Sequence, residues 1–371
     1  MLDTNEFKGR FGFGAMRLPM RDGEPDYELC NQMFDAFLDA GLNYFDTAHV
    51  YLGGKSEVAL RESLVKRHPR ESFFLVDKLT HGTFRDPATL RKVLQDELDA
   101  CGVEYFDLLL AHAVNKAHYD LYTRQGVFET AKEFLAEGRA HHFGISYHDG
   151  PELLEQILTE HPEIEAVQLQ INYADWENPG VASRKNWEIC RKHGKPVMIM
   201  EPVKGGILAD PIPEVKAVFD GSGADVSYSS WALRFAAGLE GVHAVLSGMS
   251  NLAQMDDNLK TFKNFRPLDE KEMELIHQAQ QALDADKSIP CTACHYCTKG
   301  CPMEIPIPEI FNVINRRKGS PEFRTIREYG IVTAGRGTAG DCVSCGQCER
   351  ACPQGLPIIT LLRKCKAELE K

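Results

Sequence analysis

Residues 73–112 read FFLVDKLTHGTFRDPATLRKVLQDELDACGVEYFDLLLAH, and this stretch predicts a strand, a helix and a second strand. Its two ends, Phe73–Lys78 and Phe106–His112, are short runs rich in aromatic, leucine and β-branched residues, as is typical of buried parallel strands. Between them, Asp86 followed by Pro87 predicts a helix start, because aspartate caps helices well and proline is tolerated at the first helical position. The stretch therefore predicts one βαβ unit.

The same alternation of a short apolar run and a longer helical pattern fills residues 11–263. The predicted strands are Phe11–Gly14, Asn43–Asp46, Phe73–Lys78, Phe106–His112, His141–Ser146, Ala166–Gln170, Val197–Met200 and His243–Leu246. The predicted helices are Asp26–Asp39, Lys55–Arg67, Pro87–Ala100, Gly126–Ala136, Pro151–Thr159, Ala182–His193, Val226–Ala236 and Leu252–Phe262. Eight βα units within one domain favour a closed (β/α)8 TIM barrel over an open sheet.

Composition excludes several classes of partner. The chain has 371 residues, 43% of them hydrophobic and 26% charged, which is ordinary for a globular protein. No run of about eighteen apolar residues occurs, so we expect no membrane span. The net charge of −12 argues against binding to nucleic acid or to an anionic membrane, and it is compatible with a basic electron-transfer partner. The oligomeric state stays open.

Eight of the twelve cysteines lie in two copies of one spacing, C-x2-C-x2-C-x3-C-P. This run is typical of ferredoxins that hold two [4Fe–4S] clusters, in which the fourth cysteine of each run ligates the other cluster. The predicted ligand sets are Cys291, Cys294, Cys297 with Cys352, and Cys342, Cys345, Cys348 with Cys301. Two zinc sites are the alternative, but the third close cysteine and the following proline favour clusters. The other four cysteines are expected to be buried, inert thiols.

A change of pattern after residue 263 predicts a second domain. A polar helix is expected from Pro267 to about Asp284, and another over Pro308–Arg317 between the two cysteine runs. We expect a barrel domain over residues 1–285 and a small, mainly α-helical, ferredoxin-like iron–sulfur domain over residues 286–371. Because the chain opens without an apolar signal segment and carries thiol ligands, we expect a cytoplasmic location, in an organism that lives with little oxygen.

Polar residues gather at the predicted carboxyl ends of the strands, where the active sites of such barrels lie. Lys78 ends one strand, and Asp46 on the neighbouring strand is placed to supply its counter-charge. A cation beside a phenol favours phenolate, so Tyr51 in the following loop is placed to donate a proton near neutral pH. His112 ends the next strand and is placed to hydrogen-bond a substrate carbonyl. Alone, each has a plainer structural interpretation; together they predict a catalytic site.

These segments resemble the aldo-keto reductase family over about residues 8–263. The matching motifs, in order, are NYFDTAHVY at 43–51, FLVDK at 74–78, DLLLAH at 107–112 and FGIS at 143–146. The resemblance implies NADPH-dependent reduction of a carbonyl, an aldehyde or ketone, to an alcohol. It also implies a catalytic tetrad with a proton donor, two residues that tune it and one that positions the carbonyl. In that order, these are Tyr51, Lys78 with Asp46, and His112.

The resemblance further implies a nicotinamide site. Ser146 and Gln168 match positions that bind the carboxamide, and Met200 stands where a tyrosine usually stacks on the ring. Tyr147 replaces a common asparagine, and the adjacent His148 is a further candidate for the site.

The adenosine end of the cofactor is implied to lie against the segment after the last strand. The candidate residues here are Ser250, Asn251, Gln254 and Asn258, with Lys204 as a candidate contact to the pyrophosphate. Asn251 stands where an arginine or lysine usually pairs with the 2′-phosphate, and asparagine cannot form that charged, bidentate contact. The resemblance implies NADP(H), and the asparagine at this position leaves NAD(H) open.

The cysteine-rich tail resembles helical dicluster modules fused to aldo-keto reductases in anaerobes. We expect the clusters to relay electrons and expect a redox protein of the ferredoxin or flavodoxin type as a partner. Three alternatives stay open. The clusters feed a reductase through a flavin, which is not excluded; the barrel is a docking scaffold in an electron-transfer protein; or the clusters are structural. The sequence does not identify the substrate.

Overall fold

The computed structural model describes residues 2, 5–263, 265–286, 288–317 and 322–370. The chain divides into two compact units, the first made of residues 1–203 with 219–276 and the second of residues 204–218 with 277–371. The boundary expected between residues 285 and 286 stays a prediction. Within the described residues, no helix is long and apolar enough to cross a membrane.

Eight parallel strands close into a barrel in the first unit, which confirms the predicted fold. They are β1 (Phe11–Gly14), β4 (Tyr44–Asp46), β5 (Phe74–Leu79), β6 (Phe106–Val114), β7 (Ala140–Tyr147), β8 (Ala166–Gln170), β9 (Val197–Met200) and β10 (Val242–Gly248). A small antiparallel pair that the sequence analysis did not expect, β2 (Met20–Arg21) and β3 (Glu24–Pro25), follows β1.

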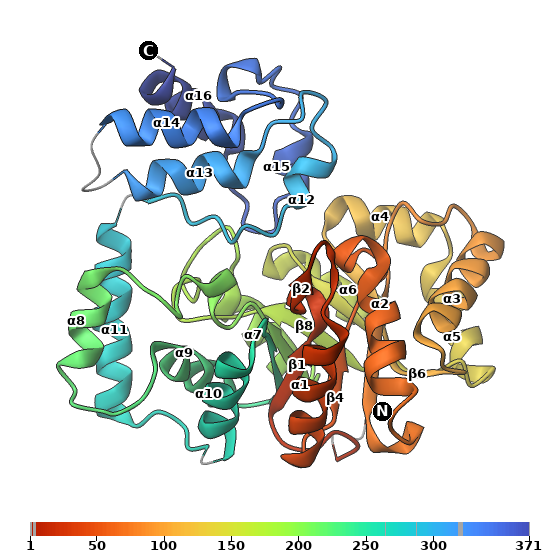
Figure 1. Cartoon of the computed structure of the whole chain (residues 1–371). Helices are drawn as coiled ribbons and strands as arrows, with labels where there is room; N and C mark the ends of the chain where they lie inside the picture. The colour runs from red at the N-terminus through yellow and green to blue at the C-terminus, as the bar shows by residue number, and fades with distance from the viewer. Residues whose placement is uncertain (1, 3–4, 264, 287, 318–321, 371) are drawn as a thin grey trace. The chain divides into compact units, whose positions relative to one another are not determined.

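Helices cover the outside of the barrel (Figure 1). The eight predicted helices appear as α1 (Tyr27–Asp39), α2 (Lys55–Leu60, continued by a π turn to Val65), α3 (Pro87–Cys101), α5 (Val127–Ala136), α6 (Pro151–Glu160), α7 (Ser183–Lys192), α9 (Tyr228–Ala237) and α10 (Leu252–Lys263). The predicted start of α3 is confirmed, since Asp86 accepts a hydrogen bond from the Thr89 backbone N–H at 2.8 Å.

Three further helices accompany the barrel helices along the chain. The polar helix predicted before the cysteine runs is α11 (Glu270–Ala285). Two others, α4 (Lys116–Arg124) and α8 (Pro213–Asp220), were not predicted. They are short, and α4 is mostly polar with two buried tyrosines, so neither gives a strong helical period.

Aromatic and aliphatic side chains fill one end of the barrel interior. Phe7, ahead of β1, lies with its ring centroid 5.3 Å from that of Tyr44 and 5.3 Å from that of Phe74. The same cluster includes Leu108 and Leu246. The opposite end, where the strands finish, is left to polar residues.

The register of the strands sets which residues meet at that opposite end. Asp46 pairs with Val76, and Lys78, two residues further along β5, pairs with Leu110. Ser146 pairs with Gln168 across β7 and β8. Because parallel strands in register finish together, residues more than a hundred positions apart arrive at one edge of the barrel.

The second unit is helical around a small apolar core. Its helices past the barrel are α12 (Tyr296–Lys299), α13 (Ile307–Arg316), α14 (Glu322–Val332), α15 (Gln347–Ala351) and α16 (Ile358–Leu369) (Figure 1). Its core contains Ile310, Phe311 and Leu362, each fully buried. Helix α13 matches the expected Pro308–Arg317 helix, whereas α14 and α16 were not predicted. The mainly helical character of the tail is confirmed.

Candidate functional site

Lys78 and Asp46 form a buried ion pair at the mouth of the barrel. None of the Lys78 side chain is exposed. Its ammonium donates to Asp46 Oδ1 at 2.6 Å and to the Thr47 carbonyl oxygen at 2.5 Å. The Gln168 amide donates to the other carboxylate oxygen, Oδ2, at 2.8 Å. With both oxygens held, Asp46 is a fixed counter-charge for a cation that burial would otherwise disfavour.

A second carboxyl next to Lys78 in sequence does not compete for it. Burial, with Glu57 nearby, raises the pKa of Asp77 well above its usual value. The Cys101 thiol lies 3.6 Å from this carboxyl. Since consecutive residues of a strand point to opposite faces, Asp77 faces away from the barrel interior, and its raised pKa disfavours a charge there. Asp46 therefore carries the compensating charge.

Tyr51 and His112 complete the group of four. Tyr51 is buried, and the Lys78 ammonium lies 4.8 Å from the centre of its ring. The rings of Tyr51 and His112 are 5.9 Å apart, centre to centre, at an angle of 79°. The structure thus brings together all four residues that the sequence analysis selected at the mouth.

His112 is held as a neutral imidazole. Burial, and then the charge of Lys78, lower its pKa well below the usual value. Its Nδ1 lies 2.8 Å from the Thr80 hydroxyl oxygen. When that hydroxyl donates to Nδ1, Nε2 carries the hydrogen and is the atom free to donate. Thr80 is a residue that sequence reasoning missed, although it follows Lys78 by only two positions.

Further histidines surround His112. His81 and His118 stack with their ring centres 3.7 Å apart. Burial lowers the pKa of His81 to about 4, and it does the same for His148. Of these three histidines, only His148 was a candidate from the sequence. His81 lies in the loop after β5, and His118 lies on helix α4, which follows β6. Both positions come just beyond a strand end, and this could have marked them as candidates from the sequence.

Three of the expected cofactor residues meet at the ends of β7, β8 and β9. Ser146 and Gln168 lie side by side, both almost fully buried. The Ser146 hydroxyl is 4.0 Å from the Met200 sulfur. Gln168, which is expected to bind the carboxamide of the cofactor, therefore also hydrogen-bonds Asp46 of the ion pair.

The residues expected at the adenosine end are organised around the start of α10. Gln254 N–H donates to Asn251 Oδ1 at 2.9 Å, and Ser250 N–H donates to Gln254 Oε1 at 2.8 Å. This reciprocal pattern caps the helix. Asn258 donates to the Ser247 hydroxyl at 3.1 Å. Asn251 thus has a capping role beside any contact to a nucleotide.

Two basic residues, Arg17 and Lys204, belong to different compact units. Arg17 packs against Gly248, and its backbone oxygen accepts from the Ser250 hydroxyl at 2.8 Å. Sequence reasoning missed it, because it lies in the short 3-10 helix Ala15–Arg17 after β1, far in sequence from the segment after β10. Lys204 belongs to the second compact unit, where its ammonium lies 3.4 Å from the Gln354 side-chain oxygen. Its contact to the pyrophosphate stays a prediction.

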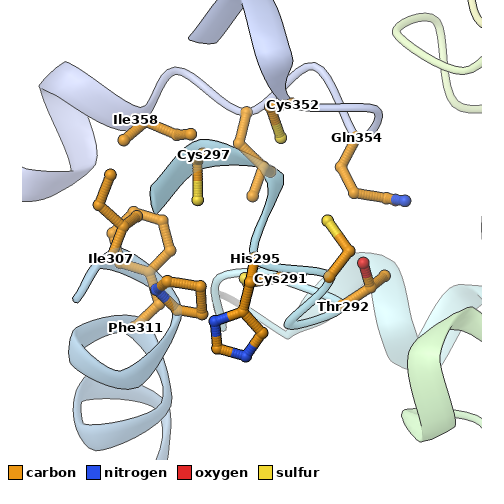
Figure 2. Close-up of a pocket in the computed structure, with 12 residues that line it drawn as sticks. Cys291, Thr292, His295, Cys297, Ile307, Phe311, Cys352, Gln354 and Ile358 are labelled. Atoms are coloured by element: carbon orange, nitrogen blue, oxygen red, sulfur yellow. The ribbon is translucent and has the colours of Figure 1, made fainter. Parts of the chain in front are cut away.

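Two cavities in the second unit are each lined by four cysteines. The first is lined by Cys291, Cys294, Cys297 and Cys352, and Figure 2 shows Cys291, Cys297 and Cys352 around it with Ile307, Phe311 and Ile358. The second is lined by Cys301, Cys342, Cys345 and Cys348. Each cavity takes three thiols from one run and the fourth from the other. Four thiols around an apolar cavity fit the donor set that a [4Fe–4S] cluster requires.

The two cysteine runs also share one backbone shape. Positive φ angles recur at equivalent positions, as in Ala293 (50°) and Ser344 (57°), and in Glu304 (52°) and Gly355 (61°). Non-glycine residues adopt this conformation at a cost, so it persists where the surroundings impose it. The repeat in sequence is therefore a repeat in structure.

Comparison with known families decides what the barrel is. A model described as the aldo/keto reductase family matches residues 10–281, which is more than half of the chain and includes every barrel strand. The chain belongs to the aldo/keto reductase family. A model described as a 4Fe-4S dicluster domain matches residues 290–356 and covers both cysteine runs. The predicted fusion of an aldo/keto reductase with a dicluster domain is confirmed.

Curated relatives of this aldo/keto reductase are distant. The NADH-specific methylglyoxal reductase of Escherichia coli (strain K12) is 23% identical over 226 residues, 55% of this chain and 66% of that protein. The norsolorinic acid reductase of Aspergillus flavus is 28% identical over 138 residues, 33% of this chain and 34% of that protein. The oxidoreductase YqkF of Bacillus subtilis is 22% identical over 290 residues, 69% of this chain and 90% of that protein. The chain thus spans about two thirds of the first relative and about a third of the second.

Solved structures share the barrel fold. The holo form of aldo-keto reductase AKR11C1 from Bacillus halodurans has a TM-score of 0.60 and 23% identity, over 73% of this chain and 91% of that one. An aldo-keto reductase from Klebsiella pneumoniae in complex with NADPH has a TM-score of 0.59 and 19% identity, over 73% of this chain and 90% of that one. The chain is an oxidoreductase by family; its substrate is a separate question.

Proposed function

We propose that the barrel reduces the carbonyl group of a small molecule to an alcohol, with hydride from NADPH or NADH and a proton from Tyr51. The observation that supports this most is the buried Lys78–Asp46 pair, which lies under the ring of Tyr51 and beside His112. A scaffold has no need for a buried cation in this place. A nicotinamide cofactor, when bound, supplies the hydride.

Lys78 makes Tyr51 a better proton donor in this proposal. A positive charge 4.8 Å from the phenol ring stabilises the phenolate that is left when the proton leaves. Burial keeps water from screening this charge. Asp46, Thr47 and Gln168 hold the ammonium in position, so that it need not reorganise during the reaction.

His112 positions the substrate. Because its pKa is far below its usual value, it is neutral at physiological pH and does not oppose Lys78 electrostatically. With the Thr80 hydroxyl donating to Nδ1, the hydrogen on Nε2 is directed to a carbonyl oxygen. Tyr51 and His112 would then donate to the same oxygen and polarise the carbonyl.

Ser146, Gln168 and Met200 are proposed to hold the nicotinamide end of the cofactor, and Ser250, Asn251, Gln254 and Asn258 the adenosine end. The E. coli relative is named as NADH-specific, and Asn251 offers no charge to a 2′-phosphate. We therefore propose that the protein accepts NADH as well as NADPH. A solvated ribose hydroxyl needs no cation, whereas a phosphate does.

The two cysteine sets are proposed to hold two [4Fe–4S] clusters. Cys291, Cys294, Cys297 and Cys352 would hold one, and Cys301, Cys342, Cys345 and Cys348 the other. Such clusters supply one-electron transfer. We propose that they relay electrons rather than only closing the fold.

Replacement of Tyr51 tests the barrel's chemistry. Anaerobically purified wild type and Tyr51→Phe are compared for methylglyoxal reduction with NADH and NADPH, and for cofactor binding by fluorescence titration. Loss of the proton donor should lower kcat by about 10²–10⁴ and leave cofactor binding within about twofold. The matched control is Tyr119→Phe on helix α4, which removes a hydroxyl that donates to Glu160 of α6, and it should keep full activity. Turnover by Tyr51→Phe at the rate of the wild type would contradict the proposal.

A further inference from the structure

Four acidic side chains are buried together outside the barrel wall, between β5 and the helices α2 and α3. Glu57 of α2, Asp77 of β5 and Cys101 at the end of α3 each bring one oxygen or sulfur atom to within 4.8 Å of the others. Glu97 lies one helical turn before Cys101, so it is on the same face of α3. At most 1% of the surface of any of the four is exposed.

These acidic groups lack the partners that buried polar atoms normally have. Asp77 Oδ1 accepts from the Lys78 backbone N–H at 2.8 Å, and Glu57 Oε2 lies 3.1 Å from His49 Nδ1. Among the described residues, however, Glu57 Oε1 and both carboxyl oxygens of Glu97 are buried with no hydrogen-bond partner. The Lys78 ammonium is already held in the ion pair inside the barrel. Three such oxygens in one group indicate a ligand that the chain itself does not supply.

Glu97 is directed into the group and away from solvent. Burial, and then the neighbouring carboxyls of Asp77 and Glu57, raise its pKa well above the usual value. The preceding residue, Asp96, has the opposite environment, because its half-exposed side chain forms an ion pair with Lys92 on the outer face of α3. A glutamate that only served solubility would share that outer face. Its inward position is explained when it has a cation to bind.

The donor atoms suit a transition-metal ion. Zinc binds thiolate sulfur at about 2.3 Å and carboxylate oxygen at about 2.0–2.2 Å, and tetrahedral geometry then places sulfur and oxygen about 3.6 Å apart. The Cys101 sulfur lies 3.6 Å from Asp77 Oδ2. Calcium and magnesium prefer oxygen ligands alone, so the thiol disfavours them. The sequence analysis expected Cys101 to be an inert buried thiol; it is buried, but its neighbours are acids.

We propose that Glu57, Asp77, Glu97 and Cys101 bind one divalent transition-metal ion, with zinc as the ion that matches the donor set. As the metal–sulfur and metal–oxygen bonds form, the thiol and the coordinating carboxyls release their protons to solvent, and no electron is transferred. The ion joins α2, β5 and α3 directly behind Lys78. All four residues belong to the first compact unit, so the proposal depends neither on the cysteine clusters nor on the substrate of the barrel.

Metal analysis of the full-length holoprotein tests the site. Anaerobically purified protein is equilibrated with a small excess of zinc chloride, desalted, and analysed for zinc and iron. We expect about one zinc atom per chain and no loss of iron. Zinc binds such donor sets more tightly than Fe²⁺ or Mn²⁺ does, so it should displace either ion. Protein that retains no zinc would overturn the proposal and would leave a group of carboxyls that share protons.

X-ray absorption at the zinc edge identifies the ligands, and iron does not interfere with it. The expected shell has one sulfur at about 2.3 Å and oxygen atoms at about 2.0–2.2 Å. Three or four sulfur neighbours would show instead that zinc has entered one of the cysteine cavities of the second unit, and the proposal would be wrong.

Cys101→Ser and Glu97→Gln locate the ion, because each changes one donor with little change in size. Each should weaken zinc binding about tenfold or more, as measured by competition with a chelator. The matched controls are Cys190→Ser, at a buried thiol on α7, and Asp96→Asn, on the outer face of α3. Both controls should bind zinc within about twofold of wild type. Glu97→Gln removes an acid that has no partner, so it tests the site even if Cys101→Ser folds poorly.

Thermal unfolding gives a readout that does not depend on counting metal. Added zinc should raise the unfolding midpoint of the wild-type barrel, because an ion that binds only the folded state stabilises it. The same zinc concentration should leave the midpoint of Glu97→Gln nearly unchanged. An equal shift in both proteins would place the ion elsewhere in the molecule and contradict the proposal.

Discussion

At the scale of single residues, Lys78 affects both the stability of the barrel and its proposed activity. Its ammonium is fully buried and is held by Asp46 and the Thr47 carbonyl. A buried ion pair gives little net stability, yet the loss of one partner strands the other charge. The residue is therefore better explained by what it does to Tyr51 than by what it adds to the fold.

A double-mutant cycle separates the two contributions. Lys78→Met leaves Asp46 buried without its cation and should cost about 3–5 kcal/mol of unfolding free energy. Lys78→Met with Asp46→Asn should recover most of that loss, because no charge is left unpaired. Both variants should lack carbonyl reduction. Chemical denaturation and turnover assays measure the two effects, and recovery of activity in the double variant would contradict the role of Lys78.

Single residues also show how much of the candidate site could be predicted from the sequence. Asp46, Tyr51, Lys78 and His112 could be selected because each lies at or just past a strand end, and strand ends follow from hydrophobic period. Thr80 and Arg17 could not, since their importance lies in a contact to His112 and to the segment before α10. Such contacts depend on side-chain packing, which local periodicity does not encode.

At the scale of elements, the segments at and beyond the ends of β5, β6 and β7 gather a set of histidines with depressed pKa values. Burial lowers the pKa of His81 and His148 to about 4, and lowers those of His112 and His118 as well. In the unfolded chain these side chains return to about 6.5. The folded state therefore binds fewer protons than the unfolded state between these values.

Stability should consequently be present above about pH 6.5 and be lost as the pH falls toward 4, by up to about 1.4 kcal/mol per pH unit for each histidine. The three tryptophans, Trp176, Trp187 and Trp231, all lie in the barrel, so their fluorescence during denaturation reports on it. His81→Gln should flatten the pH dependence. An unchanged slope would show that this histidine is not buried in its neutral form.

Each of the two cysteine runs supplies one cysteine to the cavity that the other run lines. Cys352→Ser should abolish the same cluster signal as Cys294→Ser, although the two residues lie in different runs. Cys301→Ser should instead abolish the signal that Cys345→Ser removes. Iron should fall from about eight to about four atoms per chain in each case. EPR spectra of the reduced variants check the pairing, and a match between Cys301→Ser and Cys294→Ser would mean that each run holds its own cluster.

At the scale of the whole molecule, the two compact units have different sources of stability. The barrel has a large apolar core and tightly paired strands. The second unit has a small core in which the eight cysteines of the two runs stand around or within the apolar cluster. A small core of this kind usually needs a metal to hold it together.

Removal of iron should therefore affect the units separately. Treatment of the holoprotein with chelator and mild oxidant should reduce helical circular dichroism as α12 to α16 lose order, while tryptophan fluorescence of the barrel stays native. Cofactor binding should remain within about twofold of the holoprotein. Loss of cofactor binding with the iron would show instead that the barrel depends on the clusters.

The sequence by itself determined the barrel, the place of the four candidate residues at its mouth and the grouping of the cysteines, because hydrophobic period and covalent spacing are local properties of the chain. The tertiary structure decided what no spacing contains: that Gln168 holds Asp46 from across the barrel, that Thr80 contacts His112, and that histidines from β6, α4 and two loops share one region. It also decided that Cys345 of the second cysteine set is exposed, whereas the thiols of the first set are buried or half-buried. These features follow from the closure of the strands and from side-chain burial, which form only when residues distant in sequence pack together.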